Sequence, residues 1–373
     1  MTLSTLPLKL EIQKRIRAAG PMPVSQYMDL CLTHPRYGYY TNLDPFGTVG
    51  DFTTSPEISQ MFGELIGLWS ASVWTAMGKP AVFNLVELGP GRGTMMADVM
   101  RAAKILPEFH QATSVHLVES SPLLRERQKE RLSDVGRPIQ WYSALQDVPR
   151  APAIYLANEF FDALPVNQMV RAPDGWHERT IELNEFGDFR FGISQNPISH
   201  FDQTLPKNLR DAPANSIFEW RSPVMALELG RRLQAGGAAL VIDYGHLRSA
   251  IGDTLQAVRR HRFDDPLTGP GLADLSAHVD LQALTMNATS YGARAYGAVD
   301  QGSFLVALGI VKRAAALRLN ASPEVAAAVS VALERLIAPN QTGMGAMFKV
   351  IGLAHPGIPV LPGFETNAAA RTA

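Results

Sequence analysis

Apolar positions at helical spacing dominate the first part of the chain. Leu8, Ile12 and Ile16 recur every four residues, with charged residues between them. Ser25, which follows two prolines, is the predicted N-cap of a second helix, and Ser55 followed by Pro56 predicts the start of a third. The segment HPRYGYYTNLDPFGTVGDFTTSPE between these helices is an expected long irregular loop. These patterns predict a helical N-terminal cap over residues 1–80.

From Val82 onward, short apolar runs alternate with helical segments. The runs VFNLVEL, SVHLVES, IQWYSAL and AIYLANEF, and later AALVIDYG and GAMFKVIGLA, are predicted strands. Strands that alternate with helices form right-handed βαβ units and a parallel sheet. The sequence therefore predicts an α/β fold with a Rossmann-like core over residues 81–165 and 220–352.

The alternation stops between residues 166 and 219. Short β-like runs separated by turns such as Pro173-Asp174-Gly175 predict an inserted α+β substrate-binding region with antiparallel hairpins, to which residues 255–300 contribute. DTLQAVRRH fits a strand or a short helix equally. LSAHVDLQALTMNATSYG is a predicted helix, SFLVALGIVKRAAAL is expected to run from a strand into a helix, and residues 353–373 are an expected loose tail.

Composition excludes several classes of protein. The 373 residues carry a formal net charge of −1 and one cysteine, Cys31. The balance argues against nonspecific nucleic-acid binding, and the single cysteine excludes an internal disulfide and fits a reducing compartment. No run approaches the length of a membrane span, so we expect no stable membrane insertion. The basic run from Arg259 to Arg262 is an expected solvated loop, with a functional patch as the alternative. No cluster has metal-ligand spacing, so we predict no metal.

A glycine-rich loop, Glu87-Leu88-Gly89-Pro90-Gly91-Arg92-Gly93-Thr94, follows a predicted strand and opens a helix. Glycines allow close approach of a ligand, and the helix start offers unpaired N–H groups. The next strand ends in Glu119, whose carboxylate can accept hydrogen bonds from both ribose hydroxyls. A dinucleotide fingerprint would need a glycine at Thr94. A nucleotide site and a plain structural turn stay open at this point.

The loop resembles motif I of class I S-adenosylmethionine-dependent methyltransferases, in which the acid at Glu87 commonly helps to hold the amino-acid end of the cofactor. The resemblance predicts S-adenosyl-L-methionine as the cofactor, bound by Glu87, Gly89, Gly91, Gly93 and Glu119.

Two further groups of polar residues are expected at strand ends. Asn158, Glu159 and Asp162 follow the fourth strand, as an acidic pocket or as a helix N-terminus. If the acceptor is arginine, Glu159 and Asp162 can clamp its guanidinium group, whose pKa above 12 makes deprotonation difficult. Asp243 and Tyr244 end a later strand and are predicted to orient a substrate. His278-Val279-Asp280 fits helix capping by Asp280 at least as well as a site.

Longer motifs resemble one family. HPRYGYY, GDFTTSPEISQMFGE, ELGPGRGTM, NEFFDALPV, DYGH, HVD and MGAMFKV resemble the MidA family of complex I assembly-factor arginine methyltransferases and bacterial relatives. The resemblance implies a protein substrate such as a subunit of respiratory complex I. It also implies cofactor contacts from Asn158 and from Asp51 and Ser55 in a closing loop. The motifs begin near the N-terminus, so we expect a bacterial cytoplasmic protein, or one in the mitochondrial matrix if it is eukaryotic.

Alternatives to arginine methylation stay open. They are an assembly chaperone that binds S-adenosylmethionine without essential catalysis, a small-molecule methyltransferase, and a nucleotide-dependent oxidoreductase, which the misplaced third glycine disfavours. A homodimer is a further expectation that the sequence leaves open.

Overall fold

The computed structural model describes residues 6–42, 53–340 and 342–365, which form two compact units. The first unit comprises Met1–Phe52, Asp162–Ser222 and His246–Ala283, and the second comprises Thr53–Phe161, Pro223–Gly245 and Leu284–Ala373. These units divide the chain at different places from the domain boundaries expected from the sequence. Residues 53–80, expected in the cap, belong to the second unit because Phe62 and Trp69 are buried in its core.

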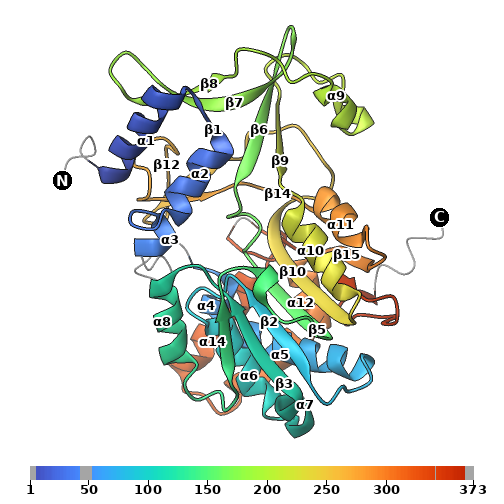
Figure 1. Ribbon diagram of the computed structural model, residues 1–373. Helices are drawn as coiled ribbons and strands as arrows, with labels where there is room; N and C mark the ends of the chain where they lie inside the picture. Colours follow the sequence, from blue (N-terminus) through green and yellow to red (C-terminus); the bar gives the residue numbers. More distant parts are fainter. Residues whose placement is uncertain (1–5, 43–52, 341, 366–373) are drawn as a thin grey trace. The chain divides into compact units, whose positions relative to one another are not determined.

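Antiparallel strands build the first unit (Figure 1). Its larger sheet has the order β1-β7-β6-β9, with β8 paired to β7, and a small sheet has the order β12-β11-β13. Its elements are α1 (Pro7–Ala19), β1 (Met22–Pro23), α2 (Val24–Thr33), α3 (Tyr39–Asn42), β6 (Val166–Ala172), β7 (Gly175–Leu183), β8 (Phe189–Ile193), α9 (Phe201–Thr204), η3 (Lys207–Leu209), β9 (Ile217–Arg221), β11 (Gln256–Arg259), β12 (Arg262–Asp264), β13 (Asp274–Ser276) and β14 (Val279–Asp280). The antiparallel hairpins predicted between residues 166 and 219 are present.

The apolar stripe of the first helix explains why α1 packs in the first unit. Leu8, Ile12 and Ile16 are buried in one cluster with residues of α2 and of the sheet, such as Val166 and Ile181. Removal of this apolar surface from water is the main stabilising contribution of such a contact.

The second unit alternates strands and helices. Its elements are α4 (Ser55–Ile58), α5 (Gln60–Ala76), β2 (Phe83–Leu88), α6 (Thr94–Ala103), α7 (Pro107–Ala112), β3 (Thr113–Val118), α8 (Pro122–Arg131), β4 (Ile139–Tyr142), η2 (Leu145–Asp147), β5 (Ala153–Asn158), α10 (Val224–Leu233), β10 (Gly237–His246), α11 (Leu281–Thr289), β15 (Arg294–Asp300), α12 (Gln301–Ala307), α13 (Ile310–Arg318), α14 (Pro323–Ile337) and β16 (Phe348–Ala354). Strand β10 and helix α11 each cross a unit boundary in the sequence.

The strands of the second unit run in the order β15-β16-β10-β5-β2-β3-β4. Neighbours from β10 to β4 are parallel, whereas β16 is antiparallel to both β10 and β15. The carboxyl ends of β2, β3, β5 and β10 therefore lie at one edge of the sheet, where open α/β sheets bind ligands. This arrangement confirms the predicted Rossmann-like α/β fold.

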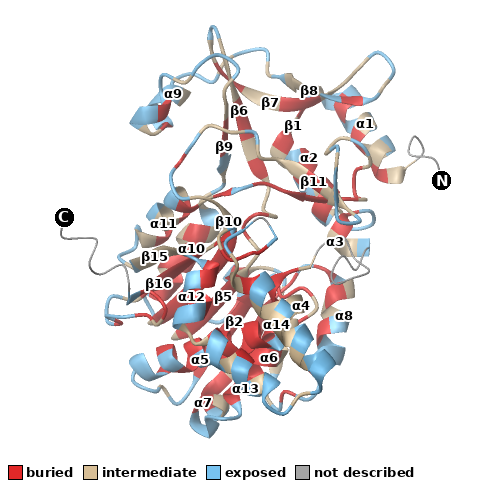
Figure 2. Ribbon diagram, turned by 180° about the vertical axis from the view of Figure 1, so that it is seen from behind, coloured by how far each residue is buried: buried red, intermediate tan, exposed pale blue. Residues whose placement is uncertain are grey.

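Alternate residues of these strands point to one buried face. Leu85, Val115, Ile154 and Leu240 share a core cluster with apolar residues of α5, α6, α12 and α13. Figure 2 shows the strands of this sheet in red, enclosed by helices with exposed outer surfaces. Burial on both faces explains why the strands are near-continuous apolar runs in the sequence.

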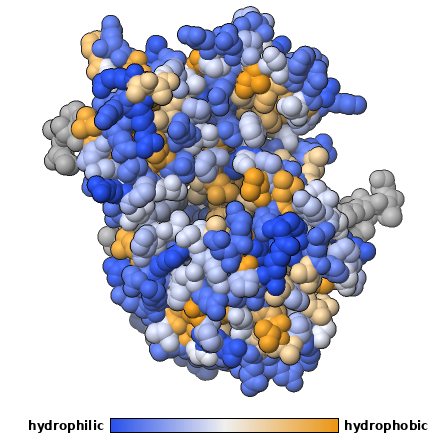
Figure 3. All heavy atoms as spheres, viewed as in Figure 1, coloured by the Kyte–Doolittle hydropathy of each residue, from blue (hydrophilic) through white to orange (hydrophobic). Residues whose placement is uncertain are grey.

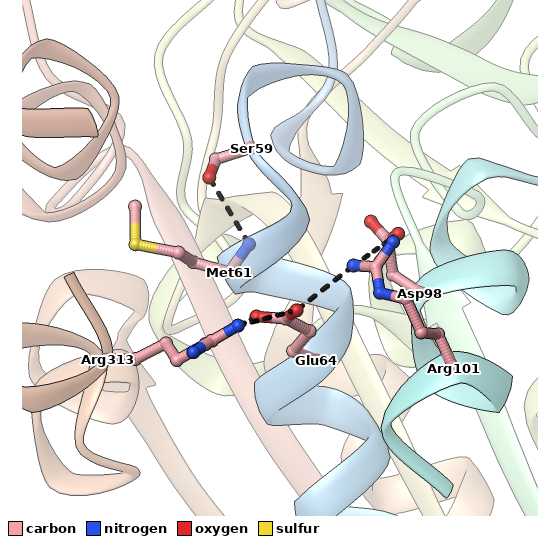
Figure 4. A network of polar contacts seen from close by, with 6 residues as sticks. All are labelled: Ser59, Met61, Glu64, Asp98, Arg101 and Arg313. Carbon is pink, nitrogen blue, oxygen red and sulfur yellow. Dashed lines mark hydrogen bonds and ion pairs between the residues drawn. The ribbon is translucent and has the colours of Figure 1, made fainter. Parts of the chain in front are cut away.

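A charged network joins three of the helices (Figure 4). Glu64 of α5, 8% exposed, accepts hydrogen bonds from Arg313 Nε at 2.8 Å and from Arg101 Nη2 at 3.1 Å. Arg101 also pairs with Asp98 of α6 at 2.9 Å. Burial raises the pKa of Asp98 to about 6. The network compensates the cost of a buried carboxylate between α5, α6 and α13.

Several local predictions were wrong. Helix α2 begins at Val24 after Pro23, so Ser25 lies inside its first turn and is not the N-cap. The segment SFLVA lies in α12 instead of a strand, because the strand precedes it as β15. The first part of LSAHVDLQ forms β13 and β14, and helix α11 starts only at Leu281. In the expected tail, Leu361 and Phe364 are buried in the core. The segment DTLQAVRRH, which fitted a strand or a helix equally, contains strand β11.

Hydrophilic residues cover most of the face seen in Figure 3. Within the described ranges, no helix combines the length and the apolar composition that a membrane crossing requires.

Candidate functional site

The glycine loop connects β2 to α6 at the carboxyl edge of the sheet. Gly89, Gly91 and Gly93 have φ values of 61°, 53° and 79°, in the left-handed region that favours glycine. A Cβ at Gly89 would lie 2.9 Å from Cδ2 of Phe160. The amide of Gly89 donates to Val118 O at 3.0 Å, which ties the loop to the neighbouring strand. The sequence folds this way because only glycine accepts these turns at such close range.

Two buried carboxyl groups lie beside this loop. Glu87 is 2% exposed, and burial, with a smaller contribution from the charge of Glu119, raises its pKa to about 8. Glu119 is 8% exposed, and burial raises its pKa to about 6 against the lowering effect of hydrogen bonds from Ser121 and Gln128. Ser121 N donates to Glu119 Oε1 at 2.8 Å, so this carboxylate has a fixed orientation.

The segment after β5 has a strained backbone. Glu159 has a φ of 50°, unusual for a residue with a side chain, and its amide donates to Ile242 O at 2.8 Å. Its Oε1 accepts hydrogen bonds from Asn158 Nδ2 at 3.0 Å and from Ser55 N at 3.2 Å. Strain held by several contacts is typical of functional segments. The structure therefore brings Ser55, Asn158 and Glu159 together.

Asp243 holds this segment in place. It is fully buried, its Oδ2 accepts from Phe161 N at 2.9 Å, and its Oδ1 accepts from Tyr244 N at 2.9 Å. The Tyr244 ring packs edge-on against Phe348, with 5.6 Å between ring centroids. These contacts are those of a residue that shapes the loop after β5.

Three further residues were singled out from the sequence, Asp162, Asp51 and Asp280. Asp162 is the first residue of its segment in the first unit, and its backbone oxygen accepts from Arg221 Nη2 at 3.0 Å and from Ala277 N at 3.2 Å. Asp51 lies outside the described residues. Asp280 caps α11, since its Oδ1 accepts from Ala283 N at 2.9 Å, as the capping interpretation predicted.

The sequence analysis missed two polar side chains beside the loop. Glu57 of α4 accepts a hydrogen bond from Thr94, the first residue of α6. Its Oε2 lies 4.0 Å from Nη1 of Arg92. Gln128 of α8 is fully buried and donates to Gly91 O at 2.7 Å. Glu57 lies in the motif GDFTTSPEISQMFGE but was not singled out there, whereas Gln128 belongs to no local motif and the sequence carries no signal for it.

The polar atoms left over at this edge fit a ligand with a cationic amine. Glu87 Oε2 and Asn158 Oδ1 are buried and have no hydrogen-bond partner among the described residues. Such atoms are costly unless a ligand satisfies them. The amino-acid end of S-adenosylmethionine carries an ammonium group. Its ribose carries two hydroxyls, which can donate hydrogen bonds to a carboxylate such as that of Glu119. Within the described residues, no group of three or more His, Cys, Asp or Glu side chains could hold a metal ion.

Comparisons with known proteins identify the family of this chain. Residues 65–299 match the model of a family described as "Putative S-adenosyl-L-methionine-dependent methyltransferase". The chain is 38% identical to the Drosophila melanogaster protein arginine methyltransferase NDUFAF7 homolog, mitochondrial, over 94% of this chain and 85% of that protein. It is 37% identical to protein arginine methyltransferase NDUFAF7, mitochondrial, of Homo sapiens, over 90% of this chain and 81% of that protein.

A solved structure is similar over nearly the whole chain. It is a crystal structure of a candidate methyl transferase from Burkholderia thailandensis bound to S-adenosyl-homocysteine, with a TM-score of 0.82 and 28% sequence identity. The similarity covers 96% of this chain and 94% of that one. Family and structure thus agree on an S-adenosylmethionine-dependent methyltransferase.

Proposed function

Since this chain belongs to the MidA and NDUFAF7 family of S-adenosyl-L-methionine-dependent methyltransferases, we propose that it methylates an arginine side chain of a protein. The observation that carries the proposal is the loop after β5. Its strained Glu159 places a carboxylate next to Phe160, whose ring in turn packs on Gly89 of the cofactor loop. The names of the curated relatives support arginine as the acceptor.

The cofactor is assigned to the edge formed by β2, β3 and β5. When bound, it supplies a methyl group on a positively charged sulfur. We assign Glu87 and Asn158 to its ammonium group and Glu119 to its ribose hydroxyls. Gly89, Gly91 and Gly93 let the backbone approach the cofactor closely. We assign Ser55, whose amide donates to Glu159 Oε1, to the border of the cofactor site. Asp51 remains a predicted contact.

The acceptor is assigned to Glu159. A carboxylate that accepts two guanidinium N–H bonds orients the group and draws its positive charge away from the attacking nitrogen. With the cofactor bound, a nitrogen–carbon bond would replace its carbon–sulfur bond, S-adenosylhomocysteine would be the leaving group, and the methylated nitrogen would lose one proton to solvent. Positioning is the main requirement of such an in-line displacement. Asp243 keeps the loop of Glu159 in shape, and Asp162 and Tyr244 remain predicted to contribute to the acceptor side.

The family suggests a subunit of respiratory complex I as the protein acceptor, and we propose the bacterial cytoplasm as the setting. The single cysteine, Cys31, is buried, which suits a reducing compartment.

The test is transfer of a labelled methyl group. The purified protein is incubated with labelled S-adenosylmethionine and a cell lysate, and the label is located by mass spectrometry. We expect it on arginine residues of a protein. Glu159→Gln, which keeps shape but removes charge, should lower the transfer rate at least 100-fold and leave S-adenosylhomocysteine affinity within about twofold. Glu126→Gln, on the exposed surface of α8, is the control and should keep full activity.

Three results would contradict the proposal in different ways. Label on a small molecule would favour a metabolite methyltransferase. Cofactor binding without any transfer would favour an assembly factor. Full activity of Glu159→Gln would exclude the clamp while leaving the methyltransferase intact.

A further inference from the structure

Gln128 is one of two buried residues in α8, a helix otherwise made mostly of charged side chains. It is fully buried although its side chain is polar. A buried carboxamide destabilises a protein unless all its hydrogen-bonding groups have partners. The contacts of this side chain therefore indicate why a glutamine occupies the position.

The carboxamide makes three hydrogen bonds with separate parts of the cofactor edge. Nε2 donates to the backbone oxygen of Gly91 at 2.7 Å and to Glu119 Oε2 at 3.2 Å. Oε1 accepts from Trp141 Nε1 of β4 at 2.9 Å. The indole N–H is only a donor, and the two other partners are only acceptors, so these neighbours allow a single orientation of the amide.

The same atom thus joins the glycine loop to the carboxylate at the end of β3. Glu119 Oε1 is already held by the Ser121 amide at 2.8 Å, and Gln128 holds the other oxygen. The bond from Gln128 also lowers the pKa of Glu119 against the effect of burial. A glutamate at position 128 would set an oxygen against two acceptors, and a leucine would leave all three partners without their bond.

We propose that Gln128 is a positioning residue for the cofactor. It fixes the distance between the glycine loop and Glu119 and aims that carboxylate at the ribose hydroxyls, and Trp141 fixes the orientation of its amide. The inference rests on the proposed role of Glu119 in holding the ribose. Gln128 itself needs no contact with the cofactor.

The test measures discrimination at the ribose. Affinities for S-adenosylhomocysteine are measured by calorimetry, and adenosine and 2′-deoxyadenosine are compared by competition. We expect the wild type to prefer adenosine at least tenfold. Gln128→Leu should lower S-adenosylhomocysteine affinity at least tenfold and reduce the adenosine preference to less than threefold. Gln140→Leu, at an exposed glutamine of β4, is the matched control and should behave as the wild type.

Two further variants separate positioning from general stability. Trp141→Phe removes the donor that orients the amide and should reduce the adenosine preference to an intermediate value. In a Glu119→Gln background, Gln128→Leu should have at most a fifth of its effect on affinity, because the two residues act together. Unfolding midpoints of all variants without ligand identify any that fail to fold, and Trp141→Phe then serves as the test.

The outcomes are distinguishable. If Gln128→Leu and Trp141→Phe weaken both nucleosides equally and the effects of positions 119 and 128 are additive, Gln128 is only structural and the inference is wrong. If the wild type itself shows no preference for adenosine, the ribose role of Glu119 fails and the inference fails with it. If the wild type does not bind S-adenosylhomocysteine, the cofactor assignment fails.

Discussion

Binding of the cofactor should release a proton from Glu87. Burial raises the pKa of this carboxyl to about 8, so about nine-tenths of it is protonated at pH 7 without ligand. An ammonium group against Glu87 Oε2 stabilises the carboxylate. Binding of S-adenosylhomocysteine at pH 7 should therefore release about 0.9 proton from Glu87. The same linkage predicts that this group strengthens binding about ninefold between pH 6 and pH 7, with little gain above pH 8.

Other titratable groups exchange fewer protons than Glu87 when the ligand binds at pH 7. Glu119, whose pKa burial raises to about 6, is only about one-tenth protonated. The amino group of the ligand, with an ordinary pKa of about 7.7–8.0, takes up about 0.1–0.2 proton when it binds as the cation. The variant Glu87→Gln keeps the protons exchanged by Glu119 and by the ligand amino group and lacks the proton released by Glu87. The difference between wild type and variant isolates the proton from Glu87.

The assay is titration calorimetry at pH 7 in buffers of different ionisation enthalpy. The slope of the observed enthalpy against the buffer enthalpy gives the number of protons released. Equal slopes for wild type and Glu87→Gln would refute the assignment of Glu87 to the ammonium group. The sign for stability follows from the same pKa. Because it is raised above 4.5, this group lowers the free energy of unfolding of the ligand-free protein as the pH rises from 4.5 to about 8, and Glu87→Gln lacks this contribution.

Two substitutions test the framework of the site. Gly89→Ala combines a φ of 61° with a Cβ 2.9 Å from Phe160, so it should lower S-adenosylhomocysteine affinity at least tenfold and the free energy of unfolding by about 1–2 kcal/mol. Gly78→Ala, with a φ of 84° and open space around it, has the same strain and should leave affinity unchanged; equal losses in calorimetry would contradict the role of close approach. Glu64→Gln removes the carboxylate between Arg101 and Arg313 and should destabilise the protein by about 2 kcal/mol in denaturant unfolding. Glu108→Gln, at the exposed pair with Lys79, should change stability by less than about 0.5 kcal/mol, and an equal effect of both would show that the network adds nothing.

The α/β alternation, the glycine loop and the two acids beside it were predictable from the sequence. Each depends on local chemistry. Four of the six buried residues of Phe83–Leu88 are apolar, as a buried strand requires, and left-handed turns need glycine at Gly89, Gly91 and Gly93. The carboxylates Glu87 and Glu119 were predictable because parallel strands bring their carboxyl ends to one edge.

The contacts between distant side chains at that edge depend on the folded arrangement of the chain. Gln128 is 37 residues from Gly91, and Ser55 is 104 residues from Glu159, so no spacing along the chain indicates either contact. The same limit applies to Asp243, whose carboxylate binds the amide of Phe161 from another strand. Hydrophobic periodicity indicates that one face of an element is buried, but it does not indicate which other element packs against that face. For that reason residues 53–80 were expected in the cap, although α5 packs on the sheet of the second unit.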